Sequence, residues 1–86
     1  EAPDIHYQMA LAYEADEIFE DAIKEFKKAI ELDPAYFLAY KRLGVLYTNI
    51  KEYKLAIENF EKYISLISNE DEKQNIMNTI ERLKFI

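Results

Sequence analysis

Residues 40–60 read YKRLGVLYTNIKEYKLAIENF, and residues 6–26, 34 positions earlier, read HYQMALAYEADEIFEDAIKEF, a weaker copy of the same pattern. The identical residues of the two copies extend past these segments and pair as Tyr13/Tyr47, Ala22/Ala56, Ile23/Ile57, Phe26/Phe60, Lys28/Lys62, Ile30/Ile64 and Leu32/Leu66. Self-similarity at a fixed period of this size indicates a protein built from repeated supersecondary units. The repeat decides the fold, whereas it leaves the identity of a partner open.

The composition favours one small helical domain. Half of the 86 residues are hydrophobic, and one glycine and two prolines leave little material for tight β-hairpins. The formal net charge of −6 disfavours nucleic acid and anionic membranes as partners, because both attract lysine and arginine. No cysteine is present, which excludes disulfides, and no apolar run approaches the roughly 20 residues of a membrane-spanning helix. The compartment stays open, with the cytoplasm slightly favoured.

Apolar residues recur at helical spacing along the whole chain. The spacing and the breaks between runs predict helices over about Asp4–Ala15, Ile18–Leu32, Ala35–Asn49 and Glu52–Leu66, and a fifth that ends near Phe85. Asp33 and Pro34 are expected to stop the second helix and to open the third as N-cap and first helical residue. Asn69 and Glu72 resemble a capping box at the start of the fifth helix. Because the corners are short, neighbouring helices are expected to run antiparallel.

The order of small and aromatic residues resembles the tetratricopeptide repeat, a 34-residue unit with the pattern W-x2-L-G-x2-Y…A-x3-F…P. The second copy matches it at Leu43, Gly44, Tyr47, Ala56 and Phe60, with Tyr40 in the tryptophan place and Ser68 in the proline place. The first copy matches it at Tyr13, Ala22, Phe26 and Pro34, with His6, Met9 and Ala10 in the three leading places.

The resemblance implies an all-α fold of five helices, in which antiparallel helix-turn-helix hairpins stack as a right-handed superhelix. It divides a single domain, residues 1–86, into a first repeat at 3–36, a second at 37–70 and a capping helix at 71–86. Because the chain begins at Glu1 rather than methionine, we expect it to be a piece of a longer protein.

Small side chains are expected where the two helices of a hairpin approach closely. Ala10 and Gly44 should face Ala22 and Ala56 there, because a larger residue would overpack the contact. Phe26 and Phe60 are expected to fill the wedge between one hairpin and the next.

The polar residues give no sign of catalysis. His6, the only histidine, stands in the tryptophan place and is expected to pack, since one imidazole without cysteine forms no usual zinc site. The carboxylates at 16–17 and 70–72 lie at expected helix starts, where negative charge complements the helix dipole. The chain has no glycine-rich phosphate loop and no nucleophile elbow. We therefore expect no enzyme activity, no cofactor and no metal.

In the family that the pattern resembles, the first helix of each hairpin lines a concave groove that holds an extended peptide or a helix. The positions that correspond here are Asp4, Tyr7, Gln8, Leu11, Glu14, Leu38, Lys41, Arg42, Val45, Thr48, Asn49, Asn75, Thr79 and Arg82. Tyr7 is expected to project into this groove. Lys41, Arg42 and Arg82 would form a cationic cluster over an apolar floor, which suits a partner segment with an acidic residue beside a hydrophobic anchor. The alternative is that Lys41 and Arg42 pair with Glu14 or with surface carboxylates.

Several more specific functions are disfavoured. One version of such a groove clamps the C-terminal carboxylate of chaperone tails with lysine and asparagine, but Tyr7, Leu11, Arg42 and Glu72 occupy those places here. The related 35-residue family that binds RNA differs in period and in charge. The most favoured function is a protein–protein interaction module that acts as a scaffold. Two alternatives remain, namely a homo-oligomer that packs through the fifth helix with Phe85 and Ile86, and a passive spacer.

Overall fold

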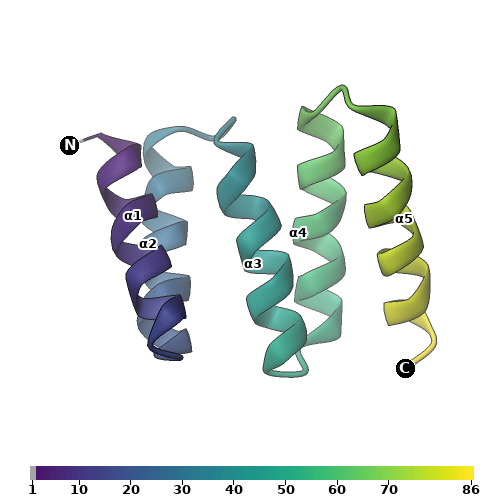
Figure 1. Cartoon of the computed structure of the whole chain (residues 1–86), viewed down its shortest axis with the longest axis horizontal. Helices are drawn as coiled ribbons and strands as arrows, with labels where there is room; N and C mark the ends of the chain where they lie inside the picture. Colours follow the sequence, from purple (N-terminus) through teal and green to yellow (C-terminus); the bar gives the residue numbers. More distant parts are fainter. Residues whose placement is uncertain (1) are drawn as a thin grey trace.

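The computed structural model describes residues 2–86, which form five α-helices and no strand. The helices are α1 (Pro3–Ala15), α2 (Phe19–Leu32), α3 (Phe37–Asn49), α4 (Tyr53–Leu66) and α5 (Glu70–Lys84). They lie side by side in chain order, with the two chain ends at opposite ends of the row (Figure 1). Each helix packs on its neighbour along the chain, which confirms the expected all-α fold of stacked antiparallel hairpins. In Figure 1, α1 and α3 lie nearer the viewer than α2.

The corners inside the two hairpins share one geometry. Glu17 and Lys51, 34 residues apart, both have a left-handed backbone, with φ of 59° and 66°. The following amides, of Ile18 and Glu52, donate to the carbonyls of Tyr13 and Tyr47 at 2.9 and 2.8 Å. This is the Schellman arrangement that ends helices, although glycine is the usual residue at its left-handed position.

The connection between the hairpins differs from the expectation. Asp33 and Pro34 do stop α2, but α3 begins only at Phe37, with Tyr36 as its N-cap. The Asp33 carboxylate accepts a hydrogen bond from the Ala35 amide at 3.0 Å, and the Asp33 carbonyl accepts one from Tyr36 at 3.0 Å. These two bonds form a separate turn, so the prediction of Asp33 as N-cap and Pro34 as first helical residue was wrong.

The core is one continuous cluster that runs through both hairpins. The expected repeat residues Ala10, Ala22, Phe26, Leu43, Gly44, Tyr47, Ala56 and Phe60 are buried in it, Tyr13 is half-buried and Pro34 is exposed in the turn. A Cβ placed on Gly44 would lie 2.5–2.7 Å from three carbons of the Phe60 ring. The atoms nearest to this Cβ therefore belong to the ring of Phe60 in the same hairpin, and the expected approach to Ala56 stays a prediction.

Candidate functional site

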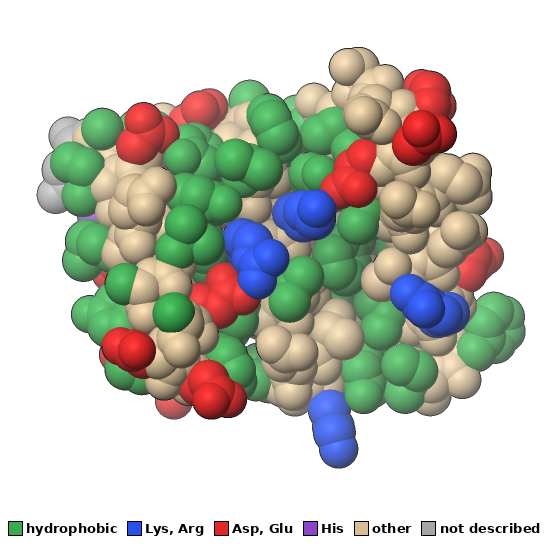
Figure 2. Space-filling view, in the orientation of Figure 1, with side chains coloured by type: hydrophobic (Ala, Val, Ile, Leu, Met, Phe, Trp, Pro, Cys, Tyr) green, Lys and Arg blue, Asp and Glu red, His purple; other side chains and the backbone are tan. Residues whose placement is uncertain are grey.

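The α1–α3–α5 face is the surface made by the first helix of each hairpin together with α5, and Figure 2 looks onto it. Of the residues expected to line a groove, Tyr7, Leu11, Glu14, Lys41, Arg42, Val45, Thr48 and Thr79 are half-buried here, whereas Asp4, Gln8, Leu38, Asn49, Asn75 and Arg82 are exposed. Near the centre of this face, basic and acidic side chains lie beside one another among apolar ones (Figure 2).

The expected cationic cluster is not a cluster of unpaired charges. Arg42 donates from both Nε and a terminal nitrogen to the two carboxylate oxygens of Glu14, which joins α3 to α1. Lys41 donates to Glu72 Oε2 at 2.7 Å, which joins α3 to α5. Arg82 lies ten residues beyond Glu72 on α5, about 15 Å along the helix, and donates to Thr79 Oγ1 at 3.2 Å. The structure therefore matches the alternative, in which Lys41 and Arg42 are neutralised by carboxylates of the same chain.

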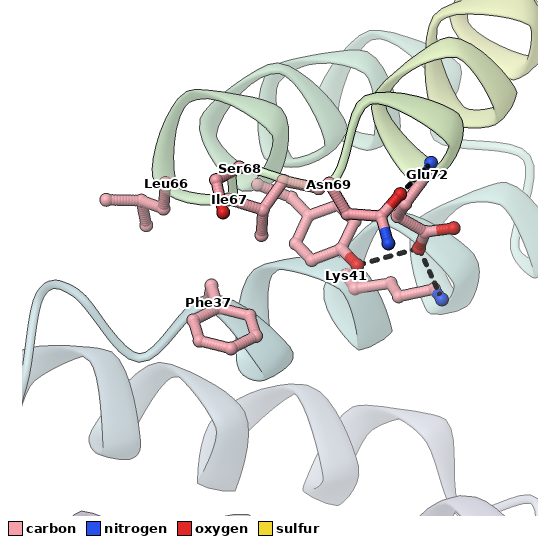
Figure 3. A pocket seen from close by; sticks show the side chains of 8 residues that line it. Phe37, Lys41, Leu66, Ile67, Ser68, Asn69 and Glu72 are labelled. Atoms are coloured by element: carbon pink, nitrogen blue, oxygen red, sulfur yellow. Dashed lines mark hydrogen bonds and ion pairs between the residues drawn. The ribbon is translucent and has the colours of Figure 1, made fainter.

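A cavity of about 560 Å³ opens beside the Lys41–Glu72 pair (Figure 3). It is lined by the start of α3, the end of α4 and the turn that leads into α5, through Phe37, Lys41, Tyr63, Leu66, Ile67, Ser68, Asn69 and Glu72. The rings of Phe37 and Tyr63 lie 6.3 Å apart between centroids, tilted by 33°, and Phe37 is 41% exposed. We call this the α3–α4–α5 pocket. Its size and its aromatic and aliphatic lining suit a large apolar side chain.

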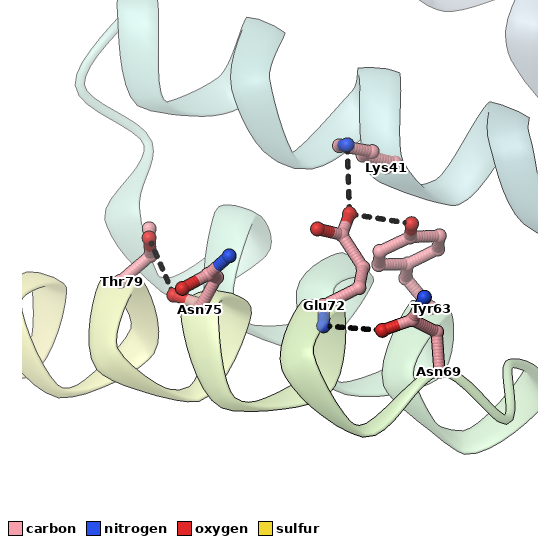
Figure 4. Close-up of polar contacts among 6 residues, drawn as sticks. All are labelled: Lys41, Tyr63, Asn69, Glu72, Asn75 and Thr79. Atoms are coloured by element: carbon pink, nitrogen blue, oxygen red, sulfur yellow. Dashed lines mark hydrogen bonds and ion pairs between the residues drawn. The ribbon is translucent and has the colours of Figure 1, made fainter.

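Glu72 is the polar centre of this pocket (Figure 4). Its Oε2 atom accepts hydrogen bonds from Lys41 Nζ and from the Tyr63 hydroxyl, both at 2.7 Å. The bond from Lys41 and that from Tyr63 hold the pKa of Glu72 below its usual value. Burial, together with the bond to Glu72, raises the pKa of Tyr63 to about 12. Lys41 Nζ also lies 5.6 Å from the centre of the Tyr63 ring.

The start of α5 matches the capping box predicted from the sequence only in part. Asn69 caps α5 as expected, because its side chain accepts the Glu72 amide at 2.9 Å. The reciprocal half of a capping box does not form, since the Glu72 carboxylate is bound to Lys41 and Tyr63 instead. Of the residues expected in the groove, only Lys41 lines the pocket. One signal in the sequence could have indicated this pocket, namely that Glu72 stands at a position where the carboxylate clamp has a different residue.

Tyr7 is half-buried and packs against two neighbouring rings. Its ring centroid lies 5.5 Å from that of Phe26 and 5.2 Å from that of Tyr36. Burial raises the pKa of Tyr7, and burial together with a bond to Asp4 raises the pKa of Tyr36 to about 12. Both tyrosines are therefore packed and un-ionised at neutral pH.

His6 packs between α1 and α2, as expected. It is buried, and its Nδ1 lies 2.7 Å from Glu25 Oε1, while Lys28 approaches the other carboxylate oxygen of Glu25 at 3.4 Å. The contact with His6 holds the pKa of Glu25 below its usual value. Across residues 2–86, no three His, Asp or Glu side chains are placed to hold a metal ion. No helix in this part of the chain is long and apolar enough to cross a membrane.

Two family profiles match the middle of the chain. A profile described as TPR repeat matches residues 19–51, and one described as tetratricopeptide repeat matches residues 39–70. Together they span residues 19–70, which contain Gly44 and the corner at Lys51. The chain belongs to the tetratricopeptide repeat family. Repeats of this family form non-catalytic scaffolds and generally mediate protein–protein interaction.

Similar proteins include the human DnaJ homolog subfamily C member 7, which is 31% identical over 65 residues, or 76% of this chain. The chain spans only 13% of the length of that protein. Two solved structures of a tetratricopeptide repeat domain protein from Salinibacter ruber are similar over all of this chain at 20% identity. The solution structure has a TM-score of 0.84 over 90% of its own chain, and the crystal structure one of 0.83 over 99%. At this identity they show the fold alone.

Proposed function

We propose that this chain is a protein–protein interaction module that binds a peptide or helix of a partner along the α1–α3–α5 face, without catalysis. In this proposal, an apolar side chain of the partner enters the α3–α4–α5 pocket and anchors the segment. The observation that carries the proposal is this pocket of about 560 Å³, which opens next to the ion pair at the centre of the face.

The exposed apolar surface beside the pocket supports an extended contact. Phe37 and Leu38 are each 41% exposed, and both also line a second hollow of about 160 Å³ at the α2–α3 turn. A partner chain that runs from the pocket towards this turn would cover both side chains. Burial of apolar area contributes about 25 cal/mol per Å², so two such side chains and one anchor would offset part of the cost of association.

The charge of the partner follows from the state of Lys41. Lys41 is already paired with Glu72, and Arg42 is already paired with Glu14. An acidic residue of a partner therefore binds Lys41 only by displacing Glu72. We propose that the apolar anchor supplies most of the affinity, and that an acidic neighbour of the anchor takes the place of Glu72 on Lys41. An exchange of one carboxylate for another is close to neutral in free energy, because similar bonds are broken and formed.

A random peptide library displayed on phage tests the binding site. We expect the domain to enrich peptides that contain a large apolar residue, and Phe37→Ser with Ile67→Ser to lose them. Leu55→Ser is the matched control, since Leu55 is 39% exposed on α4 and lines none of the cavities described here. No enrichment, or equal binding of the enriched peptides to the pocket variant, would overturn the proposal.

Glu72→Gln tests the role of charge. The glutamine oxygen can still accept from Tyr63, while the ion pair with Lys41 is removed. Enriched peptides with an acidic residue next to the anchor should bind this variant more tightly than the wild-type domain. Unchanged affinity for these peptides would show that Lys41 does not contact the acidic residue.

Self-association is the second candidate function. Phe85 is 87% exposed, Ile86 73% and Met77 47%, and all three lie in or beyond α5. Sedimentation velocity over a range of protein concentrations distinguishes the two functions, because a self-associating domain changes its sedimentation coefficient without any partner. A constant monomer under these conditions would leave binding of another protein, or the role of a passive spacer.

A further inference from the structure

The corners inside the two hairpins lie on one edge of the molecule. The α1–α2 corner at Glu17 and the α3–α4 corner at Lys51 both lie at the lower edge of the row in Figure 1, and both have the left-handed backbone described above. We call the surface that contains them the corner edge. Because the corners are copies 34 residues apart, each position in one has an equivalent position in the other.

The two corners carry opposite charges. Residues 16–21 contain four carboxylates and no lysine or arginine, and we call them the acidic corner. Residues 50–54 contain two lysines and one glutamate, and we call them the basic corner. Glutamate is replaced by lysine at two equivalent positions, in the pairs Glu17/Lys51 and Glu20/Lys54. In Figure 2, acidic side chains gather at the lower left, and a basic side chain projects from the middle of the lower edge.

The charges of the corners are not neutralised within the chain. The ion pairs among residues 2–86 involve other side chains, so the four carboxylates of the acidic corner and the two lysines of the basic corner have no charged partner there. Each corner also exposes a large apolar side chain, because Ile18 is 43% and Ile50 42% exposed. The corner edge therefore has two similar apolar centres that are surrounded by charges of opposite sign.

We propose that the corner edge binds a second copy of this chain in a two-fold symmetric dimer, in which the acidic corner of each copy faces the basic corner of the other. A two-fold rotation about an axis perpendicular to the view of Figure 1, midway between the corners, forms both contacts at once. Ile18 of one copy then lies near Ile50 of the other, between the opposite charges. This contact differs from the association through α5 that is considered above.

The size of the corner edge predicts a weak dimer. The chain extends 35 Å along the row and 18 Å in depth, so the contact covers at most roughly 600 Å² of each copy, as in transient complexes. The net charge of −6 on each copy opposes association. Charges more than about 8 Å apart are largely screened at physiological ionic strength, however, whereas the charges of facing corners are close together. The same charges fix the orientation, because like charges that face each other are strongly unfavourable.

The symmetry of the dimer affects the peptide site. Because the two-fold axis is perpendicular to the α1–α3–α5 face, both copies present this face on the same side of the dimer. A partner that carries two copies of its binding segment would engage both faces, which increases avidity without a new contact. Only this gain in avidity rests on the proposed function.

Charge reversal at the basic corner tests the dimer, by sedimentation velocity over a range of protein concentrations. Lys51→Glu with Lys54→Glu makes both corners acidic, and we expect the dissociation constant of the dimer to rise by about tenfold or more. The domain should still fold, because glutamate stands at the equivalent positions of the acidic corner. Lys27→Glu with Lys62→Glu is the matched control. It changes the net charge equally, on exposed parts of α2 and α4 away from the corners, and should dimerise nearly as the wild type does.

A complementary variant provides the rescue. Glu17→Lys with Glu20→Lys places lysine at the equivalent positions of the acidic corner, so opposite charges meet again when this variant is mixed with the one that is reversed at the basic corner. We expect the equimolar mixture to form a heterodimer. Phe85→Ser should leave the dimer of the wild-type corners unchanged, because Phe85 lies beyond α5 and outside both corners.

Four results would overturn the proposal. They are a wild-type domain that stays monomeric up to about millimolar concentration, an unchanged dissociation constant after charge reversal at the basic corner, an equal loss in the control, and a mixture of the two corner variants that does not associate. Loss of the dimer in Phe85→Ser would assign association to α5 instead. Peptides from the phage library should bind the corner variants as they bind the wild type, so failure of the dimer and failure of the peptide site are observed separately.

Discussion

Gly44→Ala is the sharpest test of how this fold is packed. In an exposed helix interior, alanine in place of glycine adds about 1 kcal/mol to helix stability. At Gly44 the new Cβ would lie 2.5 Å from the Phe60 ring, whereas ordinary contacts begin near 3.4 Å, so the ring or the helix must retreat by about 1 Å. Phe60 is only 3% exposed and cannot turn out into solvent.

The two effects oppose each other, and their sizes decide the sign. Overpacking of a tight core costs about 1–3 kcal/mol, so after the gain in helix propensity the net loss is up to about 2 kcal/mol. A domain of this size is stable by roughly 4–13 kcal/mol, and each kcal/mol shifts the melting temperature by about 4–8 °C. The loss is therefore well within measurement.

Urea unfolding followed by circular dichroism measures the change, and a double-mutant cycle with Phe60→Leu assigns its cause. With the ring removed, Gly44→Ala should stabilise the protein instead of destabilising it, by up to about 1 kcal/mol. A Gly44→Ala protein that is more stable than the wild type, or the same change in stability in the presence of Leu at 60, would refute the contact between Gly44 and the ring as the cause.

Three further perturbations test other parts of the structure. Glu17→Gly and Lys51→Gly should each raise the free energy of unfolding by up to about 1 kcal/mol, because glycine adopts a left-handed backbone without steric cost; destabilisation of both proteins in urea would contradict this geometry. Phe60→Ala should cost about 3–5 kcal/mol, and a melting curve that moves by only a degree or two would argue against its place in the core. Because the pKa of Glu72 is lowered in the fold, its stabilisation is complete above the ordinary value of 4.5 and is lost as the pH falls through the lower folded value. The stability difference between the wild type and Glu72→Gln should therefore shrink below about pH 4.5, and a constant difference would show that this carboxylate is not coupled to folding.

The local structure was largely predictable from the sequence. The predicted bounds of the first four helices agree with the structure within two residues at each end, because helical periodicity and breaks such as Asp33–Pro34 are local signals. The predicted start of α3 was the least accurate of these bounds, because the Asp33 carboxylate accepts a hydrogen bond in a turn rather than capping the helix. Both outcomes are compatible with the sequence Asp-Pro, and only the placement of α3 on α2 separates them.

The candidate site was predictable only in part. The positions on the α1–α3–α5 face follow from the repeat register, but the charge state of Lys41 and Arg42 does not. Their partners, Glu72 and Glu14, are 31 and 28 residues away, and no local pattern relates them. The pocket was missed because the ends of three helices line it rather than one helix face.

The sequence by itself determined the family, the helices and the burial of the repeat residues such as Phe26 and Phe60, because a 34-residue repeat of small and aromatic residues buries these positions inside and between its hairpins. The tertiary structure alone decided which charges are neutralised, where a cavity opens and which apolar side chains remain exposed. These properties depend on distances between side chains of different helices, and such distances are set only when the hairpins stack. Ile5 and Leu43 illustrate the difference: both are apolar and lie at helical spacing in the sequence, but Ile5 is exposed whereas Leu43 is fully buried.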